Sequence, residues 1–583
     1  MNVSTLDWAL VILYFVFALG TGLYFSRRAS GNIVEYFTSG RSLPWWVAGT
    51  SMVATTFAAD TPLAVTELVA NHGIAGNWLW WNMLMSGLLT VFLFSRLWRR
   101  AEVITDVEFT ELRYSGKPAA FLRGFRALYL AIPINLIVMG WVTLAMVKII
   151  ELAIDVDKWV AVGIAMAVTL LYSTMSGLWG VVMTDMLQFV IAMVGSIALA
   201  YFAIDAVGGI DGLKEGLVTN YGPDHGLLNF LPEIGSVWMP MTAFFVYLAV
   251  NWWAAWYPGA EPGGGGYIAQ RMFAAKDEKH SFLATLWFNI AHYALRPWPW
   301  ILVALVSMVL YPDLEDKQTG YILVMLNHLP TGFKGLLLAS FAAAFMSTIS
   351  TQLNWGSSYL VNDFYKRFIK KEASDSHYVA VARISTVILV ILSGFVTSQM
   401  DTIAGAWKFL LAIGAGTGAV YILRWFWWRI NAWSEISAMV MSFITAISLQ
   451  SIFGMDTSDA NVFAQVMLIT VGASSVVWLT VTFMTEPESE EVLLKFYRKV
   501  RPGGKFWKPI SELAPEVQTD KGLSWDLADW AAGLIMIYST LFGVGKILLG
   551  HSLLGIGLLI LAAMAFSFIR WDLNRRGWKS ISE

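Results

Sequence analysis

The sequence contains no cysteine, and only 14% of its 583 residues are charged. Without cysteine the chain cannot form disulfides, thiolate metal sites or iron–sulfur clusters. Soluble domains have roughly 25% charged residues, so this chain has too few charges to cover a surface that faces only water. Its net charge of −2 gives no reason to expect a nucleic-acid partner. Apolar residues, by contrast, make up 57% of the chain.

The sequence also lacks the motifs that would indicate an enzyme or an ATP-driven pump. No phosphate-binding G-x-x-x-x-G-K-[ST] loop, H-E-x-x-H zinc motif or G-x-S-x-G nucleophile elbow occurs. The segment nearest to a phosphate-binding loop, Gly543–Lys546, continues into Ile547, and the seven histidines are scattered. We therefore predict that the protein is not an enzyme, and that any transport it performs is driven by an ion gradient.

Apolar runs of about 20 residues, the length that crosses a bilayer, recur along the whole chain. Counting them against the charged loops predicts an all-α integral membrane protein with about 15 transmembrane helices. The expected spans are residues 7–25, 44–70, 76–95, 126–150, 159–176, 181–204, 237–258, 282–311, 333–360, 378–398, 403–423, 433–453, 462–484, 528–549 and 552–569. The 29 tryptophans suit the two membrane interfaces, so membrane lipid is an expected partner.

Positive charges are concentrated in every second loop. If the N-terminus lies outside, the inside loops and the C-terminal tail contain most of the lysines and arginines. The outside loops then contain little beyond Lys158, Lys214 and Lys317. This distribution follows the positive-inside rule and predicts a multi-pass protein of the cell membrane with the N-terminus outside and the C-terminus cytoplasmic. The polar segment 485–527 would be cytoplasmic, and it is too short for a catalytic domain.

Two apolar spans contain interruptions of the kind that line transport pathways. Residues 52–62 combine small and hydroxyl side chains with Asp60 and Pro62, and the proline predicts a break in this helix near mid-bilayer. A kinked helix that packs through its small residues is the alternative. Residues 257–266 are rich in proline and glycine and cannot form a regular helix, although a plain loop at the membrane face would also explain the glycines.

One face of the ninth span has small and hydroxyl residues at i, i+3, i+4 and i+7 spacing, namely Ala344, Ser347, Thr348 and Thr351. Hydroxyls, together with carbonyls freed by a broken helix, are the hard oxygen ligands that a sodium ion takes. The alternative is that these hydroxyls bond to their own helix or hold neighbouring helices together. The stripe alone favours neither interpretation.

Four local motifs, in order along residues 8–430, identify a known family by resemblance. They are Tyr36–Leu43 before the expected broken helix, Gly177-Leu178-Trp179 followed by Thr184-Asp185, Gln270-Arg271 with Ala275-Lys276-Asp277, and Ala344–Thr351 leading to Asp363–Lys366. Together they resemble the sodium:solute symporter family, which transports sugars, proline, sialic acid and iodide. The resemblance implies a leucine-transporter-type core of two inverted five-helix repeats.

The same resemblance implies a division of the chain. The two repeats would be residues 44–205 and 237–424, joined by an extracellular loop, 206–236. An extra helix and a cytoplasmic loop, 1–43, would precede them. Two further helices in 425–484, a cytoplasmic segment in 485–527, and two C-terminal helices with a tail in 528–583 would follow. The two interrupted spans would then occupy corresponding positions, as the first helix of each repeat.

By resemblance, sodium is the ion, and its site comprises three carbonyls and two hydroxyls. They belong to Ala54, Phe57, Ala344, Ser347 and Thr348. A second sodium is expected at Asp185 with Ser350 and Thr351, since the family uses an acidic residue at the first of these positions in cation coupling. The sixth span also has no basic residue to pair with this acid. The alternative is that Asp185 is hydrated and only steers cations.

Candidate contacts to the solute are spread over several spans: Thr56, Thr61, Asn82, Trp253, Tyr267 and His292. Packing or interfacial anchoring is the alternative role for most of them. Stacking on aromatic rings with hydroxyl and amide partners would suit a sugar or polyol. Arg296 and Lys408 keep an amino acid or a carboxylate open.

Three departures from the family pattern leave the solute undefined. Ser176-Gly177 stands where much of the family has two glycines, and Gly264–Gly266 stand where sugar carriers tend to have amides. No arginine lies within 127–147, where carriers of acidic sugars have one. The sequence thus predicts a sodium-coupled symporter of a small organic solute, with a sugar or polyol favoured. An amino acid or carboxylate carrier, or a gradient-independent facilitator or channel, is the alternative.

Overall fold

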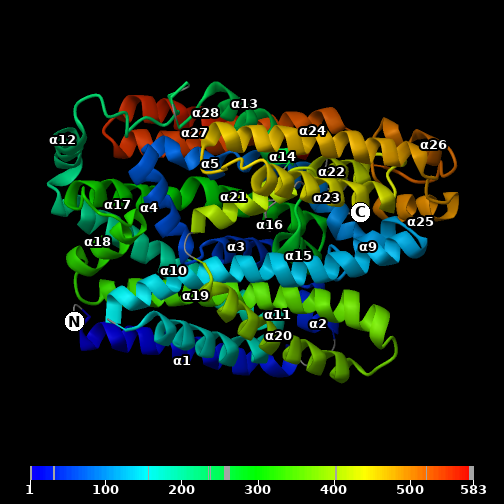
Figure 1. The fold of residues 1–583 in the computed structure, drawn as a ribbon, viewed down its shortest axis with the longest axis horizontal. Helices are drawn as coiled ribbons and strands as arrows, with labels where there is room; N and C mark the ends of the chain where they lie inside the picture. The colour runs from blue at the N-terminus through cyan, green and yellow to red at the C-terminus, as the bar shows by residue number, and fades with distance from the viewer. Residues whose placement is uncertain are drawn as a thin grey trace.

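The computed structural model describes residues 3–29, 33–154, 156–233, 235–236, 238–254, 263–400, 403–519 and 522–576, and the regular structure of these ranges is helical. Within them, eleven helical segments are long and apolar enough to cross a membrane. They are Thr5–Phe25, Ile74–Ala101, Gly116–Ile154, Leu178–Ala206, Glu278–Leu310, Phe333–Ile369, Asp375–Ser398, Ala432–Ile452, Ala460–Met484, Leu523–Leu548 and Ser552–Arg576. Most of the long helices run along the long axis of the molecule (Figure 1). The prediction of an all-helical membrane protein is confirmed.

The α-helices in chain order are α1 (Thr5–Ala29), α2 (Ile33–Thr38), α3 (Trp45–Thr56), α4 (Asp60–His72), α5 (Trp78–Trp81), α6 (Leu84–Leu89), α7 (Ser95–Ala101), α8 (Phe109–Arg113), α9 (Gly116–Tyr129), α10 (Asn135–Ile154), α11 (Lys158–Ala206), α12 (Gly209–Tyr221), α13 (Met241–Val246), α14 (Trp252–Ala254), α15 (Gly266–Ala274), α16 (Glu278–Ile290), α17 (Pro297–Leu310), α18 (Gly320–His328), α19 (Phe333–Ser358), α20 (Asp375–Ser398), α21 (Ile403–Gly414), α22 (Gly418–Phe426), α23 (Ala432–Ile447), α24 (Ala460–Met484), α25 (Glu490–Val500), α26 (Lys508–Ser511), α27 (Leu523–Leu548) and α28 (Ser552–Arg576). Short 3₁₀ or π-helical turns join or extend them: η1 (Ser39–Arg41), η2 (Ile74–Asn77), η3 (Thr90–Phe94), η4 (Leu130–Ile134), η5 (Tyr247–Asn251), η6 (Ala291–Leu295), η7 (Lys317–Thr319), η8 (Tyr359–Ile369), η9 (Ser448–Ile452) and η10 (Lys505–Trp507).

Within the described ranges the structure has fewer long spans than the 15 expected, because four expected spans do not appear there as long, separate helices. Span 44–70 is divided into α3 and α4, and span 403–423 into α21 and α22. Span 237–258 is a shorter apolar helix, Met241–Ala254, after which residues 255–262 lie outside the described ranges. Spans 159–176 and 181–204 belong to one helix of 49 residues, α11, and among its described residues Leu178–Ala206 qualifies as a span. Counting apolar runs detected these segments but not where each helix stops.

The expected break in the second span is present. Helix α3 ends at Thr56, and α4 begins at Asp60. Between them Phe57 leaves the helical conformation with φ −87° and ψ 53°. Pro62 lies in the first turn of α4, where a backbone N–H would have no partner within the helix, so the proline is tolerated there. The sequence therefore predicted the break, which lies just before the proline.

The seventh span is interrupted as well. Helix α14 ends at Ala254 and α15 begins at Gly266, and the part of the gap that the structure describes, 263–265, is not helical. Gly263 and Gly264 have φ angles of 85° and 75°, a region that side chains disfavour. A Cβ on Gly264 would lie 2.7 Å from the Thr90 side chain. These glycines thus allow a sharp turn close to η3, while residues 257–262 of the predicted segment lie outside the described ranges.

Helix α19, which contains the hydroxyl stripe, lies at the centre of the molecule. Nearly all of its side chains are buried, and it packs against α1, α3, α10, α11 and α20. Its N-terminal amides are capped from α1, because the Asp7 carboxylate accepts hydrogen bonds of 2.7 Å from the backbone of Gly332 and Gly335. A stripe of hydroxyls on this helix therefore faces protein and not lipid.

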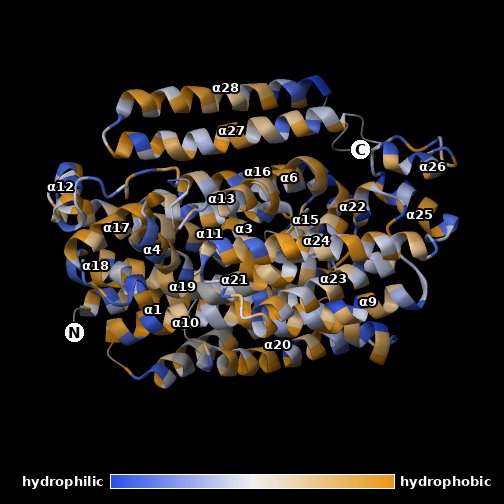
Figure 2. Ribbon diagram, turned by 45° about the horizontal axis from the view of Figure 1, so that its top comes forward, coloured by the Kyte–Doolittle hydropathy of each residue, from blue (hydrophilic) through white to orange (hydrophobic). Residues whose placement is uncertain are grey.

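The last two helices form a hairpin at the edge of the bundle. Figure 2 shows α27 and α28 side by side as a layer at the top of the view, and the two helices pack closely on each other. Large apolar side chains of α28 are exposed, among them Leu553, Ile560 and Met564. An exposed apolar face on a helix of this length is what contact with lipid requires.

Candidate cation and solute sites

The end of the broken helix α3 lies against the hydroxyl stripe of α19. The Thr348 hydroxyl donates a 2.7 Å hydrogen bond to the carbonyl oxygen of Thr55 and a 3.0 Å bond to the carbonyl of Ala344. The residues of the expected sodium site are all buried, with exposed fractions between 1% and 4%: Ala54, Phe57, Ala344, Ser347 and Thr348. The structure thus brings the two elements of this site into direct contact through Thr348.

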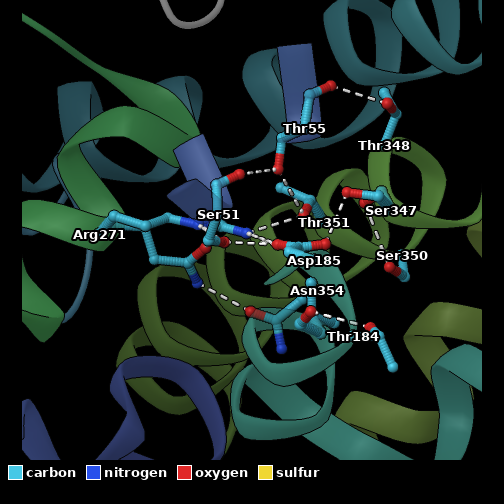
Figure 3. Close-up of polar contacts among 12 residues, drawn as sticks. Ser51, Thr55, Thr184, Asp185, Arg271, Ser347, Thr348, Ser350, Thr351 and Asn354 are labelled. Carbon is cyan, nitrogen blue, oxygen red and sulfur yellow. Dashed lines mark hydrogen bonds and ion pairs between the residues drawn. The ribbon is translucent and has the colours of Figure 1, made fainter. Parts of the chain in front are cut away.

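A second polar group surrounds the carboxylate of Asp185 on α11. Its two oxygens accept short hydrogen bonds from the hydroxyls of Ser51 (2.5 Å) and Ser347 (2.6 Å). The guanidinium of Arg271 lies 3.9 Å from the same carboxylate. Figure 3 shows this acid between α3, α15 and α19. Asp185 therefore connects to the expected sodium site, because Ser347 belongs to both groups.

Arg271 has more partners than this acid. Its guanidinium donates hydrogen bonds to the Ser51 hydroxyl (3.1 Å), the Thr351 hydroxyl (2.8 Å) and the side-chain oxygen of Gln270 (3.0 Å). Gln270 in turn donates to the Asn354 side chain at 2.8 Å. Ser51 thus bridges acid and base, since its oxygen receives a hydrogen bond from Arg271 while its proton goes to Asp185.

The sequence prediction for this acid was incomplete. The sixth span has no basic partner for it, whereas Arg271 comes from α15, on the far side of the interrupted seventh span. Ser51 and Thr55 on α3 were also missed, although their spacing of four residues places them on one helix face. The Thr55 hydroxyl lies 3.3 Å from that of Thr351. The Gln270-Arg271 motif itself was the available signal.

The structure separates Ser350 from Thr351, the other two members of the expected second site. The Thr351 hydroxyl contacts Arg271 and Thr55. The Ser350 hydroxyl donates to the carbonyl of Ser347, on its own helix, at 3.2 Å. For Ser350, the structure therefore shows the back-bonding that was the alternative interpretation of the stripe.

The residues just described form what we call the cation group: Ser51, Thr55, Asp185, Arg271, Ser347, Thr348 and Thr351. A cavity lies beside this group. It is lined by Thr55 and Thr348 of that group, and by four of the expected solute contacts, Thr56, Thr61, Tyr267 and His292. Much of the remaining wall is aromatic: Trp80, Trp141, Phe288, Tyr293 and Trp407. Residues from both interrupted spans, 52–62 and the start of α15, thus meet in one cavity next to the proposed ion ligands.

Three polar side chains on the cavity wall bond to one another. The guanidinium of Arg296 lies 2.5 Å from Nδ1 of His292 and donates a 3.1 Å hydrogen bond to the Thr56 hydroxyl. This hydroxyl lies 3.0 Å from the same histidine nitrogen. Arg296 also lies over the ring of Trp300, 5.1 Å from its centroid. Thr56 and His292 are therefore held by Arg296.

Two of the expected solute contacts lie elsewhere. Asn82 donates to the carbonyl of Trp78 at 2.8 Å and accepts a 3.1 Å hydrogen bond from Asn251, so it fastens two helical segments. The indole of Trp253 donates to the carbonyl of Ala249, one turn earlier on its own helix. Neither residue lines the cavity, because both side chains are engaged within or between helices. The side chain of Lys408 lies outside the described ones.

Residues 36–442 match the model of the sodium:solute symporter family. The chain belongs to this family. It is 25% identical over 477 residues to a sodium/glucose cotransporter of Vibrio parahaemolyticus, covering 77% of this chain and 86% of that protein. It is also 25% identical over 538 residues to sodium/myo-inositol cotransporter 2 of Oryctolagus cuniculus, covering 84% of this chain and 78% of that protein.

The solved structure of a Na⁺-coupled sialic acid symporter has the same fold. The superposition covers 83% of this chain and 99% of that protein, with a TM-score of 0.66 and 19% sequence identity. The prediction of the family is therefore confirmed. The protein is a multi-pass sodium-coupled solute symporter and not an enzyme, with sodium as a co-transported substrate.

Proposed function

We propose that this symporter takes up a sugar or polyol-like solute together with sodium, by alternating access across the cell membrane. The observation that carries the proposal is the cavity, which combines stacking surfaces with hydroxyl, carboxylate and amide groups and is continuous with Thr55 and Thr348. Aromatic rings bind the apolar faces of sugars and polyols, while polar groups bind their hydroxyls. The glucose and myo-inositol cotransporters among its distant relatives agree with this solute class.

We propose that the coupling sodium binds between the end of α3 and α19. Its ligands are the carbonyls of Ala54, Phe57 and Ala344 and the hydroxyls of Ser347 and Thr348. An ion in this place joins the broken helix to α19, and thereby fixes the part of the cavity wall formed by Thr55 and Thr56. Sodium then favours the conformation that binds solute, and the two ligands bind cooperatively.

A second sodium is proposed at Asp185, Ser350 and Thr351. In the structure Arg271 already neutralises this acid and bonds to Thr351. A second ion therefore enters only when the guanidinium moves away, and Ser350 must turn from its own backbone. The ion and Arg271 compete for one carboxylate.

For the core, we propose two inverted repeats at 44–205 and 237–424, with the N-terminus outside and the C-terminus cytoplasmic. The fold shared with the sialic acid symporter supports such a core. So do the two interrupted helices, α3–α4 and α14–α15, which stand at the start of each repeat. Residues close to both interruptions, Ala58 in the first and Tyr267 just after the second, line the same cavity, as a site at the interface of two repeats requires.

An amino acid or a carboxylate is the second candidate solute, because Arg296 lines the cavity. Its guanidinium is a bidentate group that suits a carboxylate. The partners of Arg296 in the protein weigh against this candidate, since a carboxylate would have to displace Thr56 or His292.

The test of the proposal is uptake into sealed vesicles containing the purified protein. Radiolabelled myo-inositol and D-glucose should accumulate under an inward sodium gradient, without ATP, and should not accumulate under an equal potassium gradient. Equal rates in the two salts would favour a facilitator instead of a symporter. Accumulation of proline or lactate, without accumulation of myo-inositol or D-glucose, would instead support the second candidate solute.

A further inference from the structure

Most polar side chains on the cavity wall already have hydrogen-bond partners in the protein. The Thr56, Thr61 and Thr348 hydroxyls donate to backbone carbonyls at 2.9, 3.2 and 2.7 Å. The Trp80 indole donates to the Asn77 side chain at 2.9 Å, and Arg296 donates to Thr56 and to the carbonyl of His292. The hydrogen-bond donors of this wall are thus largely occupied.

Two acceptors on the wall are different. Asp60 Oδ1 and Gln352 Oε1 are buried and have no hydrogen-bond partner among the described residues. The residues are 3% and 1% exposed, and both line the cavity. A buried acceptor without a donor costs about 1–3 kcal/mol, and more when it is charged. A ligand that brings donors would remove this cost.

The two residues lie close in sequence to the cation group, one after α3 and one on α19. Asp60 is the first residue of α4, directly after the break that follows α3. Gln352 lies four residues after Thr348 on α19, so both residues are on one face of that helix. Gln352 is therefore on one of the two helices that sodium is proposed to join, and Asp60 begins the helix that follows the other one.

The charges on the wall indicate a neutral solute. Of the residues described as lining the cavity, Asp60 is the one carboxylic acid and Arg296 is the one arginine or lysine, so their charges are opposite when both are ionised. A cationic solute would meet Arg296, and an anionic one would meet Asp60, whereas a neutral solute leaves the balance intact.

We propose that Asp60 and Gln352 accept hydrogen bonds from hydroxyl groups of the transported solute, and that this solute is an uncharged polyol. The proposal rests on the proposed function and deepens it, by assigning the solute's recognition to two acceptors and not to Arg296. It assigns solute contact to two residues that the sequence did not predict as contacts. The aromatic wall then stacks on the apolar ring face of the polyol.

The experiment measures thermal stabilisation of the detergent-purified full-length protein by myo-inositol, D-glucose, proline and lactate, each in sodium and in potassium. The variants are Asp60→Asn and Gln352→Met, which keep shape while removing the charge or the amide. The matched control is Gln188→Met, because Gln188 Oε1 is also buried and without a partner among the described residues, but Gln188 does not line the cavity. Each variant must first show cooperative thermal unfolding in the absence of solute, which establishes that it is folded.

The expected result is that myo-inositol or D-glucose stabilises the parent protein. Its apparent affinity should fall about ten- to a hundredfold in Asp60→Asn and Gln352→Met, the loss that matches a hydrogen bond to a buried charged or polar group, and stay unchanged in Gln188→Met. Unchanged affinity in both cavity variants would overturn the proposal, as would stabilisation by proline or lactate alone. Equal polyol binding in sodium and potassium would refute the proposed coupling of solute to sodium. The role of the two acceptors would still be decided by the affinities of Asp60→Asn and Gln352→Met.

Discussion

Replacing Arg271 by methionine is the change that most severely perturbs the cation group. Methionine keeps the length of the side chain but removes the guanidinium. In the structure this guanidinium lies 3.9 Å from Asp185 and donates to Ser51 and Thr351. Both Arg271 and Asp185 are 0% exposed, so no water replaces the lost charge.

The variant should lose stability because the buried carboxylate of Asp185 is left without its positive partner. Removing one partner of a buried ion pair typically destabilises a protein by about 3–5 kcal/mol, because the other charge is left uncompensated. Asp185 keeps its hydrogen bonds from Ser51 and Ser347, so we expect the lower half of this range. A sodium ion that takes the place of the guanidinium would return about 2.7 kcal/mol at a concentration of 100 times its Kd.

The assay is thermal unfolding of the parent and the variants in detergent, first in potassium and then with increasing sodium. Arg271→Met should unfold at a lower temperature than the parent in potassium, and sodium should raise its midpoint more than that of the parent. The double variant Arg271→Met/Asp185→Asn should be more stable than Arg271→Met and should lose the extra response to sodium. A double variant no more stable than Arg271→Met would refute the reasoning, because the acid would then not be the source of the cost.

Two further predictions concern the charged groups. Asp185→Asn should reduce the charge moved per solute from two to one in reversal-potential measurements on reconstituted vesicles, and one charge in the parent would refute the second ion. Glu111→Gln should lower the free energy of unfolding by roughly 1 kcal/mol at neutral pH. Although burial raises the pKa of Glu111, hydrogen bonds from Arg367 and Arg123 outweigh this and hold the pKa below its ordinary value. This contribution is complete above the ordinary glutamate pKa and is lost as the pH falls through the lowered one, so parent and variant should converge in acid. A constant difference down to about pH 4 would contradict it.

The helical membrane fold was predictable because hydropathy alone reports it. Runs of apolar residues must be helical in lipid, and the breaks near Pro62 and Gly264 follow from the backbone limits of proline and glycine. The division of residues 158–206 was not predictable in the same way. The structure assigns one helix there, although Gly177 and Gly180 disfavour a helix by about 1 kcal/mol each relative to alanine, because no proline interrupts the backbone hydrogen bonds.

The candidate site was predictable where one helix holds several of its residues. The spacing of Ala344, Ser347 and Thr348 is local information, and the resemblance supplied α3 as the facing element. Contacts between distant segments were not accessible to this reasoning. The pairing of Arg271 with Asp185 depends on how α15 and α11 both pack against α3 and α19 after an interruption. Asn82 and Trp253, predicted as solute contacts, do not line the cavity, because polarity does not reveal which way a side chain points.

The central claim, a sodium ion held between α3 and α19, is tested most directly by a sodium titration of stability in Thr348→Ala. Thr348 is the residue that connects both elements. Thr386→Ala is the matched control, since Thr386 is likewise buried and donates only to its own helix among the described contacts. We predict that the sodium concentration for half-maximal stabilisation rises at least about tenfold in Thr348→Ala, which is the loss of affinity expected when one ion ligand is removed. In Thr386→Ala this concentration should stay unchanged. Equal sodium midpoints in the parent and Thr348→Ala would contradict it.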